Sequence, residues 1–331
     1  MALEVELDKK KLEYTNEDGQ KVRVDVDQDL TEKEEEAFES NHYANLAEEL
    51  ENQEVLNIGK SLIRAYEDDK ASRKDWEDQY SKGLKMLGVV VEDRSDPFPG
   101  ASGVHHPLLA EAATQFQARA IAEIFPAGGP VKTQVIGKVT DKKLDQSQRV
   151  QDFMNFQITQ EIPDYFNELD QMLFYLALAG SAFKKVYFDN TLDRICSKFV
   201  PADQFVISYE NTDLETAERY TQVMKLTTNE IKRRQVEGFY RDVPVTQNQG
   251  GQNSSDLVQS TIEKLEGMST SMSDKIHTIL EIHADIDLGE DESGLALPYI
   301  VTVDYESGQT LAIRRNWKED DPLKRKRTYF I

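Results

Sequence analysis

Apolar residues recur every three to four positions between residues 55 and 180, which is the spacing of an amphipathic helix. From Val55 to Leu87 this spacing predicts two helices, or one long helix with a weak centre. We expect another helix from about Asp141, which Pro163 ends or kinks, and a last one that Gly180 closes as a C-terminal cap. This part of the chain is therefore predicted to be mainly helical.

A loop dense in proline and glycine, Asp96 to Pro107, interrupts the helical region. Pro107 suits the first position of a following helix, which is expected to stop at the sequence PAGGP, Pro126 to Pro130. The predicted apolar face of that helix consists of residues at four-residue spacing: Leu108, Ala112, Phe116, Ala120 and Ile124. Three apolar residues of the preceding helix are expected to pack on it: Trp76, Tyr80 and Leu84.

Alternating apolar and polar positions predict strands, most of them in the second half of the chain. The predicted strands are Val131 to Val135, Ala182 to Phe188, Arg194 to Val200, Lys275 to Leu288, Pro298 to Asp304 and Thr310 to Trp317. The second and third are expected to form a hairpin, and so are the last two. Capping-box spacing predicts helix starts at Thr212, with Glu215, and at Thr227, with Glu230.

These elements predict an α+β fold in five parts. The parts are a largely flexible acidic arm (1–54), a helical region (55–180), a β-hairpin with short helices (181–245), a flexible insertion rich in Gln, Gly, Asn and Ser (246–274) and a β-rich region (275–331). Thr328 to Ile331 resembles the start of another strand. We therefore expect the chain to be part of a longer protein.

Charge is distributed unevenly along the chain. The formal net charge is −22, and residues 1–54 hold 18 acidic against 6 basic residues. A protein that wraps nucleic acid gains affinity from Lys and Arg that release counterions, so this balance argues against such a role. No stretch approaches eighteen consecutive apolar residues and the N-terminus lacks the order of a secretory signal, so we expect no membrane partner.

Two short motifs contain residue types that could react or bind a ligand. Gly59-Lys60-Ser61 is similar to the end of a phosphate-binding loop, but Glu54 stands where that loop requires glycine. His105-His106 could supply a general base, although a structural pair is favoured because no nucleophile or acidic partner stands at a diagnostic spacing. Cys196 is the only cysteine, so it excludes an intrachain disulfide and a cysteine-based zinc site and is expected to be a buried thiol.

The strand from Lys275 to Leu288 offers the best candidate metal ligands. One side of it carries His277, Glu281, His283, Asp285 and Asp287. The favoured alternative is a water-exposed sheet face, with the other side packed inside: Ile276, Thr278, Leu280, Ile282 and Ile286. The basic cluster Lys324 to Arg327 could contact DNA or an acidic partner, but a solvated cluster is favoured. We therefore assign no catalytic, cofactor-binding or metal-binding residue from the sequence, and we expect no cofactor and no enzymatic activity.

Between Trp76 and about Val245 the sequence resembles the portal proteins of short-tailed bacteriophages. The most specific stretch is RSDPFPGASGVHHPLLAEAATQFQARAIAEIFPAGGPVKTQVIG, Arg94 to Gly137. Further matching stretches are LALAGSAFKKVYFD (Leu176 to Asp189), VPADQFVISYENTDLETAERY (Val200 to Tyr220) and EGFYRDV (Glu237 to Val243). Together they span about half of the chain in the order in which the family has them.

The resemblance implies a portal-type fold and a ring, usually a dodecamer, at one vertex of the virion capsid. In that role the helical half corresponds to the wing and the later β-rich part includes the clip or its approach. The implied partners are further copies of the chain, the major capsid protein, the terminase, a tail adaptor, and double-stranded DNA that passes without sequence recognition after assembly in the host cytoplasm. The family's tunnel loop and crown have no counterpart here, so no channel residue is carried over.

Two other classes of function remain as alternatives. A metal-dependent nucleic-acid-processing enzyme would need a phosphate loop or carboxylates gathered around a metal. An acidic scaffolding or adaptor protein would consist mostly of polar helix, whereas this sequence has aromatic-rich hairpins and Pro/Gly loops.

Overall fold

The structure is a computed structural model, and it divides the chain into two compact units, Met1–Asn45 and Leu46–Ile331. It describes residues 11–15, 21–25, 41–87, 98–100, 106–189, 192–245, 276–289 and 294–331. In the first unit, β1 (Lys11–Thr15) and β2 (Lys21–Asp25) pair as an antiparallel hairpin, and η1 (Asn41–Tyr43) is a single 3-10 turn. The predicted flexible insertion, 246–274, lies outside the described residues.

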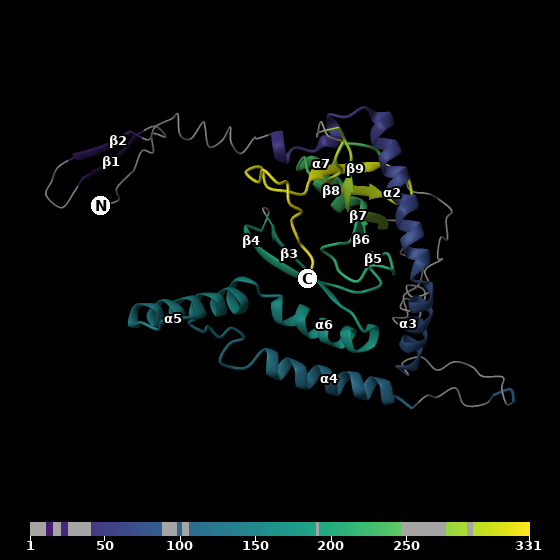
Figure 1. Cartoon of the computed structure of the whole chain (residues 1–331), viewed down its shortest axis with the longest axis horizontal. Coiled ribbons are helices and arrows are strands. Elements are labelled where there is room, and N and C mark those ends of the chain that lie inside the picture. The colour runs from purple at the N-terminus through teal and green to yellow at the C-terminus, as the bar shows by residue number, and fades with distance from the viewer. Residues whose placement is uncertain are drawn as a thin grey trace, which may run out of the picture. The chain divides into compact units, whose positions relative to one another are not determined.

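The centre of the second unit is a five-stranded antiparallel sheet with strand order β5-β6-β7-β8-β9 (Figure 1). The strands are β5 (Phe205–Ile207), β6 (Arg219–Thr227), β7 (Ile276–Ile286), β8 (Leu297–Asp304) and β9 (Thr310–Arg315). The predicted pairing of the last two strands is confirmed, and Gly308 has the positive φ of 68° that the turn between them requires. Helices and antiparallel sheets occur together, so the fold is α+β.

Both faces of this sheet are covered. Leu280 and Ile282 of β7 pack, on one face, against Val55, Leu62 and Tyr66 of α2 (Asn52–Ser72). On the other face, Ile279 packs against Ile231 of α7 (Thr228–Val236). The prediction of a water-exposed sheet face is therefore wrong at His277 and His283, which are buried. The alternation along the strand was real, but a second layer covers the polar side.

The second unit begins earlier than the predicted boundary of the acidic arm. Leu46 and Ala47, in the turn η2 (Leu46–Glu48), are buried in the core beneath the sheet, and α2 starts at Asn52. The acidic side chains around these two residues point outward, so a short apolar segment packs despite its charged context. The arm predicted for residues 1–54 therefore ends nine residues sooner in the structure, at Asn45.

Arg73 separates α2 from α3 (Lys74–Met86), so the first of the two predicted arrangements, two helices, is the one observed. Its guanidinium is buried and donates hydrogen bonds to the carbonyl oxygens of Ala202, Asp203 and Phe205, at 2.8–2.9 Å, and to the Glu77 carboxylate at 2.9 Å. The junction between the helices is thereby tied to the loop that leads into β5.

Three further helices form a layer below the sheet in the view of Figure 1, beside the lower end of α3. They are α4 (Leu108–Ile124), α5 (Asp141–Phe156, continued by the π-helical turn η3, Gln157–Glu161) and α6 (Tyr165–Ala179). The predicted cap of α6 is confirmed, because Gly180 is left-handed with φ 79°. The predicted packing of α3 on α4 is confirmed in part: the two helices are in contact, but Tyr80 and Leu84 are buried against Leu178 and Ala179 of α6.

The predicted hairpin β3 (Phe183–Asp189) and β4 (Arg194–Val200) is confirmed as an antiparallel pair. The end of the chain adds to it, because the backbone N–H of Lys184 donates to the Ile331 carbonyl at 2.9 Å and that of Val186 donates to the Tyr329 carbonyl at 2.8 Å. Thr328 to Ile331 thus pairs with a strand, as its composition predicted.

One predicted strand and one predicted helix do not form. Val131 to Val135 is not a strand, because side chains of α5 satisfy its backbone: Asn155 accepts from the Val131 N–H at 2.9 Å and Gln151 from the Thr133 N–H at 3.2 Å. Thr212 starts no helix, since β6 follows within a few residues, whereas Thr227 forms the complete capping box of α7.

Candidate functional site

The candidate metal ligands of β7 do not converge. Among the residues that the structure describes, no group of three or more His, Cys, Asp or Glu side chains is placed to hold a metal ion. His277 lies near the start of the strand, where its Nε2 is 3.2 Å from the Thr228 hydroxyl, and Asp285 lies at the exposed far end. Of the five, the structure brings together only Glu281 and His283.

Glu281 and His283 belong to a buried ionic cluster that a residue from another strand completes. The Lys185 ammonium, from β3, lies 2.6 Å from Glu281 Oε1, and His283 Nε2 lies 3.0 Å from the same oxygen. Lys185 also donates to the Gln222 side chain at 2.9 Å. The Lys185–Glu281–His283 cluster therefore has a protein cation at the carboxylate, where a metal ion would otherwise have to sit.

The protonation states in this cluster follow from its burial and its partners. Burial alone would raise the pKa of Glu281, but the Lys185 ammonium and the hydrogen bond from His283 hold that pKa well below its ordinary value. Burial lowers the pKa of His283, and the hydrogen bond to Glu281 opposes this only in part. Glu281 is thus ionised and His283 neutral, so that His283 donates its Nε2 proton to the carboxylate.

The histidine of this cluster is closed to substrates. His283 has no exposed surface; the Tyr220 ring stacks on it at 4.8 Å between centroids, and Phe330 meets it edge-on at 5.4 Å. A general base must come within hydrogen-bond distance of the proton that it removes. His283 cannot reach a substrate proton, so the contribution of the cluster is structural. It links the hairpin, the sheet and the last residues of the chain. Sequence analysis missed Lys185, and its only signal was a lysine pair, Lys184-Lys185, inside an otherwise apolar strand.

Gly59-Lys60-Ser61 lies in the middle of α2 and not at a phosphate-binding turn. Gly59 is buried where α2 crosses the β8–β9 turn, and a Cβ at this position would collide with the Thr310 hydroxyl. That hydroxyl donates to the Val55 carbonyl at 3.0 Å. The glycine therefore permits close packing of helix on sheet and has no role in cradling a phosphate.

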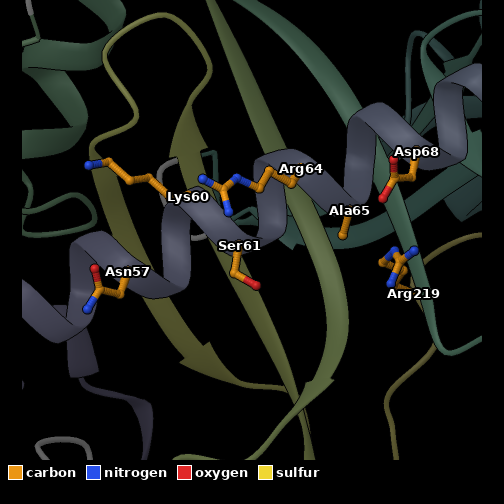
Figure 2. A pocket seen from close by; sticks show the side chains of 7 residues that line it. All are labelled: Asn57, Lys60, Ser61, Arg64, Ala65, Asp68 and Arg219. Atoms are coloured by element: carbon orange, nitrogen blue, oxygen red, sulfur yellow. The ribbon is translucent and has the colours of Figure 1, made fainter.

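Lys60 and Ser61 face a shallow depression of about 450 Å³ on the outer side of α2 (Figure 2). Its lining residues are Asn57, Lys60, Ser61, Arg64, Ala65, Asp68 and Arg219. Arg219 is already held by both carboxylate oxygens of Asp69, at 2.7 and 3.0 Å. With Asp68 also in the lining, the local charge is nearly balanced, so this depression has no strong preference for an anion.

The histidine pair and the cysteine singled out in the sequence form no reactive group among the described residues. His106 is exposed just before α4, while His105 lies outside the described residues. Cys196 is buried in β4, as expected.

The prediction of a solvated basic cluster holds only in part, because Lys324 and Lys326 are half-buried. Lys326 donates to the Ala217 carbonyl at 3.2 Å and lies over the Tyr220 ring, 4.6 Å from its centroid. Arg325 pairs with Asp321 at 2.9 Å. The cluster thus fastens the end of the chain to the sheet.

The helical layer exposes apolar surface. On α4 the predicted face points outward, with Leu108 65% and Phe116 45% exposed and Ala112 exposed between them. We call these three residues the α4 face. The helix packs on α6 through the adjoining side, where Ala113 is buried, so the predicted orientation of α4 is wrong.

A second apolar surface lies on α5, none of whose residues is buried. Its exposed apolar side chains include Leu144, Val150, Phe153, Met154 and Phe156, and we call the last four the α5 face. Exposed apolar residues that lie together on a folded protein mark interaction sites. These two faces are the strongest candidate functional surfaces among the described residues.

A comparison with known proteins found no matching family model and no matching curated protein. None of the described helices is long and apolar enough to cross a membrane.

Proposed function

We propose that this chain is a subunit of a bacteriophage portal ring, a conduit for DNA at one vertex of the capsid and a platform for terminase and tail adaptor. The observation that carries the proposal is the pair of apolar faces on α4 and α5, which no described part of the chain covers. A subunit of a closed assembly needs such surfaces, because each copy must bury apolar area against its neighbours.

The sequence resemblance supports the same proposal. Its most specific stretch, Arg94 to Gly137, contains α4, so the residues most similar to the portal family include one of the two exposed faces. Other matching stretches lie in β3, in β5 and at the start of β6. They contribute to the covered sheet and its hairpin, which would give a ring subunit a rigid body.

Charge is consistent with a conduit. DNA that moves through a pore should be held weakly, since every tight phosphate contact would be a barrier to translocation. A chain with a net charge of −22 disfavours long residence of a phosphate backbone, in contrast to a basic groove. Energy for packaging would come from a separate terminase ATPase.

The alternatives have less support in the geometry. For an enzyme, the only candidate base in the most reactive-looking cluster, His283, has no exposed surface. For an acidic scaffolding protein, a sheet covered on both faces is more fixed structure than polar helices require.

Electron microscopy of the purified chain, together with mass measurement in solution, tests the proposal. We expect closed rings with a central hole and a single subunit number. In parallel, the protein is incubated with duplex DNA, Mg²⁺ or Mn²⁺, and ATP, and we expect neither cleavage nor ATP turnover. A chain that stays monomeric at every concentration, or cleavage that His283→Ala abolishes, would contradict the proposal.

A further inference from the structure

We propose that neighbouring copies associate head to tail, with the α4 face of one copy packed against the α5 face of the next. This inference rests on the proposed function and adds to it the surfaces through which the ring closes. The α4 face is Leu108, Ala112 and Phe116, and the α5 face is Val150, Phe153, Met154 and Phe156.

The α5 face is held outward by contacts on the other side of the helix. Ser147, Gln151 and Asn155 bind the segment 131–133 through hydrogen bonds of 2.8–3.2 Å, including both the N–H and the carbonyl of Val131 to Asn155. At about 100° per residue these three positions lie on one side of α5, together with Leu144, and the four residues of the α5 face lie on the remaining arc. The helix therefore cannot roll its apolar residues inward without breaking those hydrogen bonds.

Figure 1 shows α5 extending away from α6 and the rest of the layer. Phe153 and Phe156 are 58% and 52% exposed. A protruding helix with two exposed Phe side chains, and no buried residue of its own, gains stability when another surface covers it.

The α4 face is also fixed in direction. The buried Ala113 packs on the α6 side, and the Gln117 amide donates to the Asp170 carbonyl of α6 at 3.2 Å. Leu108 and Phe116 are exposed beside that contact, in the same predicted stripe as Ala112. A second helix can approach such a surface closely.

Charge complements the apolar match. At about 100° per residue, Lys142, Lys143 and Arg149 lie on the same arc as the α5 face, and the acids of α5 lie together on another arc. These three cations make no ion pair within the described residues. On α4, Glu111 and Glu123 outnumber Arg119 on the exposed side.

This charge distribution favours contact between unlike faces. Two α5 faces brought together would oppose three cations with three cations, whereas α5 against α4 opposes cations with a net acidic surface. Unlike contact surfaces on one subunit generate rings when the rotation closes, whereas a self-complementary surface stops at a dimer. A second copy is therefore the occupant that the two faces fit best.

The test uses one variant in each face, each made at an exposed position so that the fold is kept. Phe116→Lys changes the α4 face and Phe153→Lys changes the α5 face. Val236→Lys, at an 89% exposed apolar residue of α7, is the matched control. Thermal melts check that all three variants fold, and mass measurement in solution with electron microscopy gives the assembly state.

We expect the control to form the same ring as the unaltered chain. Each face variant should lose the ring, with the dissociation constant of the contact raised at least about 30-fold. Mixing the two face variants should give one-to-one heterodimers and nothing larger, because one intact α4 face meets one intact α5 face and the two lysine-bearing faces cannot pair.

Two results would overturn the inference. If either face variant alone formed a homodimer, like faces would pair with like. If both variants kept the ring, other surfaces would hold it, and the proposed function would stand without this interface. A chain that forms no ring even when unaltered would contradict the proposed function itself, so the two failures are distinguishable.

Discussion

The sheet region and the helical layer of the second unit use similar apolar residues in opposite ways. In the sheet, residues such as Leu280 and Ile279 are fully buried, one against α2 and the other against α7. In the layer, α4 buries a single alanine and α5 buries nothing. Among the described residues, the sheet region covers its apolar side chains, whereas the helical layer leaves apolar side chains exposed.

The difference teaches where the stability of this chain and its capacity to associate are located. Burial of apolar area stabilises whichever folded or assembled state removes it from water. For the sheet that state is the folded chain, and for the layer it would be the proposed assembly. Substitutions in the two regions should therefore differ in their dependence on protein concentration.

The largest expected effect comes from Lys185→Met. It leaves the Glu281 carboxylate, whose side chain is 16% exposed, without its cation, and we expect a loss of about 3–5 kcal/mol in the free energy of unfolding. Chemical denaturation measures the loss. The double variant Lys185→Met/Glu281→Gln removes the stranded charge, so it should recover most of the stability. Equal losses in the single and the double variant would show that packing, and not charge, is the main contribution of Lys185.

A pair of variants compares the two regions directly. Leu280→Ala opens a cavity in the sheet core and should cost about 2–5 kcal/mol of unfolding free energy at any protein concentration. Phe153→Ala, on the α5 face, should cost less than about 0.5 kcal/mol in dilute solution. At high concentration the loss for Phe153→Ala should grow, since the assembly loses a contact. A loss for Phe153→Ala that is large when dilute would place Phe153 in the core of the single chain.

The strands and helices could be predicted where local patterns decide them. The hairpins β3–β4 and β8–β9, the capping box at Thr227 and the cap at Gly180 each depend on neighbouring residues, and each was confirmed. Val131 to Val135 failed because hydrogen bonds from α5, more than ten residues away, took the place of a partner strand. Periodicity alone carries no information about such distant partners.

The direction of a face was harder to predict than its existence. Spacing located the apolar stripe of α4 correctly, but a stripe indicates only that something should cover it, and Leu108 and Phe116 point to solvent. For β7 the burial was predicted wrongly in the other direction, since His283 was expected to be exposed to water and is buried against Phe330. Lys185 could not be connected to Glu281 from the sequence, because 96 residues separate them.

Acid should weaken the sheet region through His283. Its pKa is lowered below the ordinary 6.5 in the folded chain, so below about pH 6.5 the unfolded chain binds a proton that the folded chain does not. Stability is therefore complete above that pH and falls by up to about 1.4 kcal/mol per pH unit as the pH decreases. Glu281 adds a loss of the same sign below its ordinary pKa of 4.5.

Urea denaturation between pH 8 and pH 5 tests this dependence, with the fluorescence of Trp317, which packs in the sheet core, as the signal. A Trp76→Phe background leaves Trp317 as the only tryptophan. In that background His283→Gln should flatten the dependence below pH 6.5, whereas His106→Gln, at an exposed position, should leave it unchanged. An unchanged slope in His283→Gln would assign the acid sensitivity to other groups.

The smallest expected effects compare two glycines in helices of different surroundings. Gly83, in α3, has no atom within 4 Å of the position of an added Cβ, so Gly83→Ala should stabilise the chain by about 0.5–1 kcal/mol through helix propensity alone. Gly59→Ala gains the same propensity but collides with the Thr310 hydroxyl and disturbs its hydrogen bond to Val55. Overpacking of this kind costs about 1–3 kcal/mol, so the net change should be destabilising.

Thr310→Ser keeps the hydroxyl and Thr310→Ala removes it. If the collision is the cause, Gly59→Ala should be less destabilising in the Thr310→Ala background than in the Thr310→Ser background. If Gly59→Ala changed the free energy of unfolding equally in both backgrounds, the Thr310 hydroxyl would not be what the added Cβ collides with.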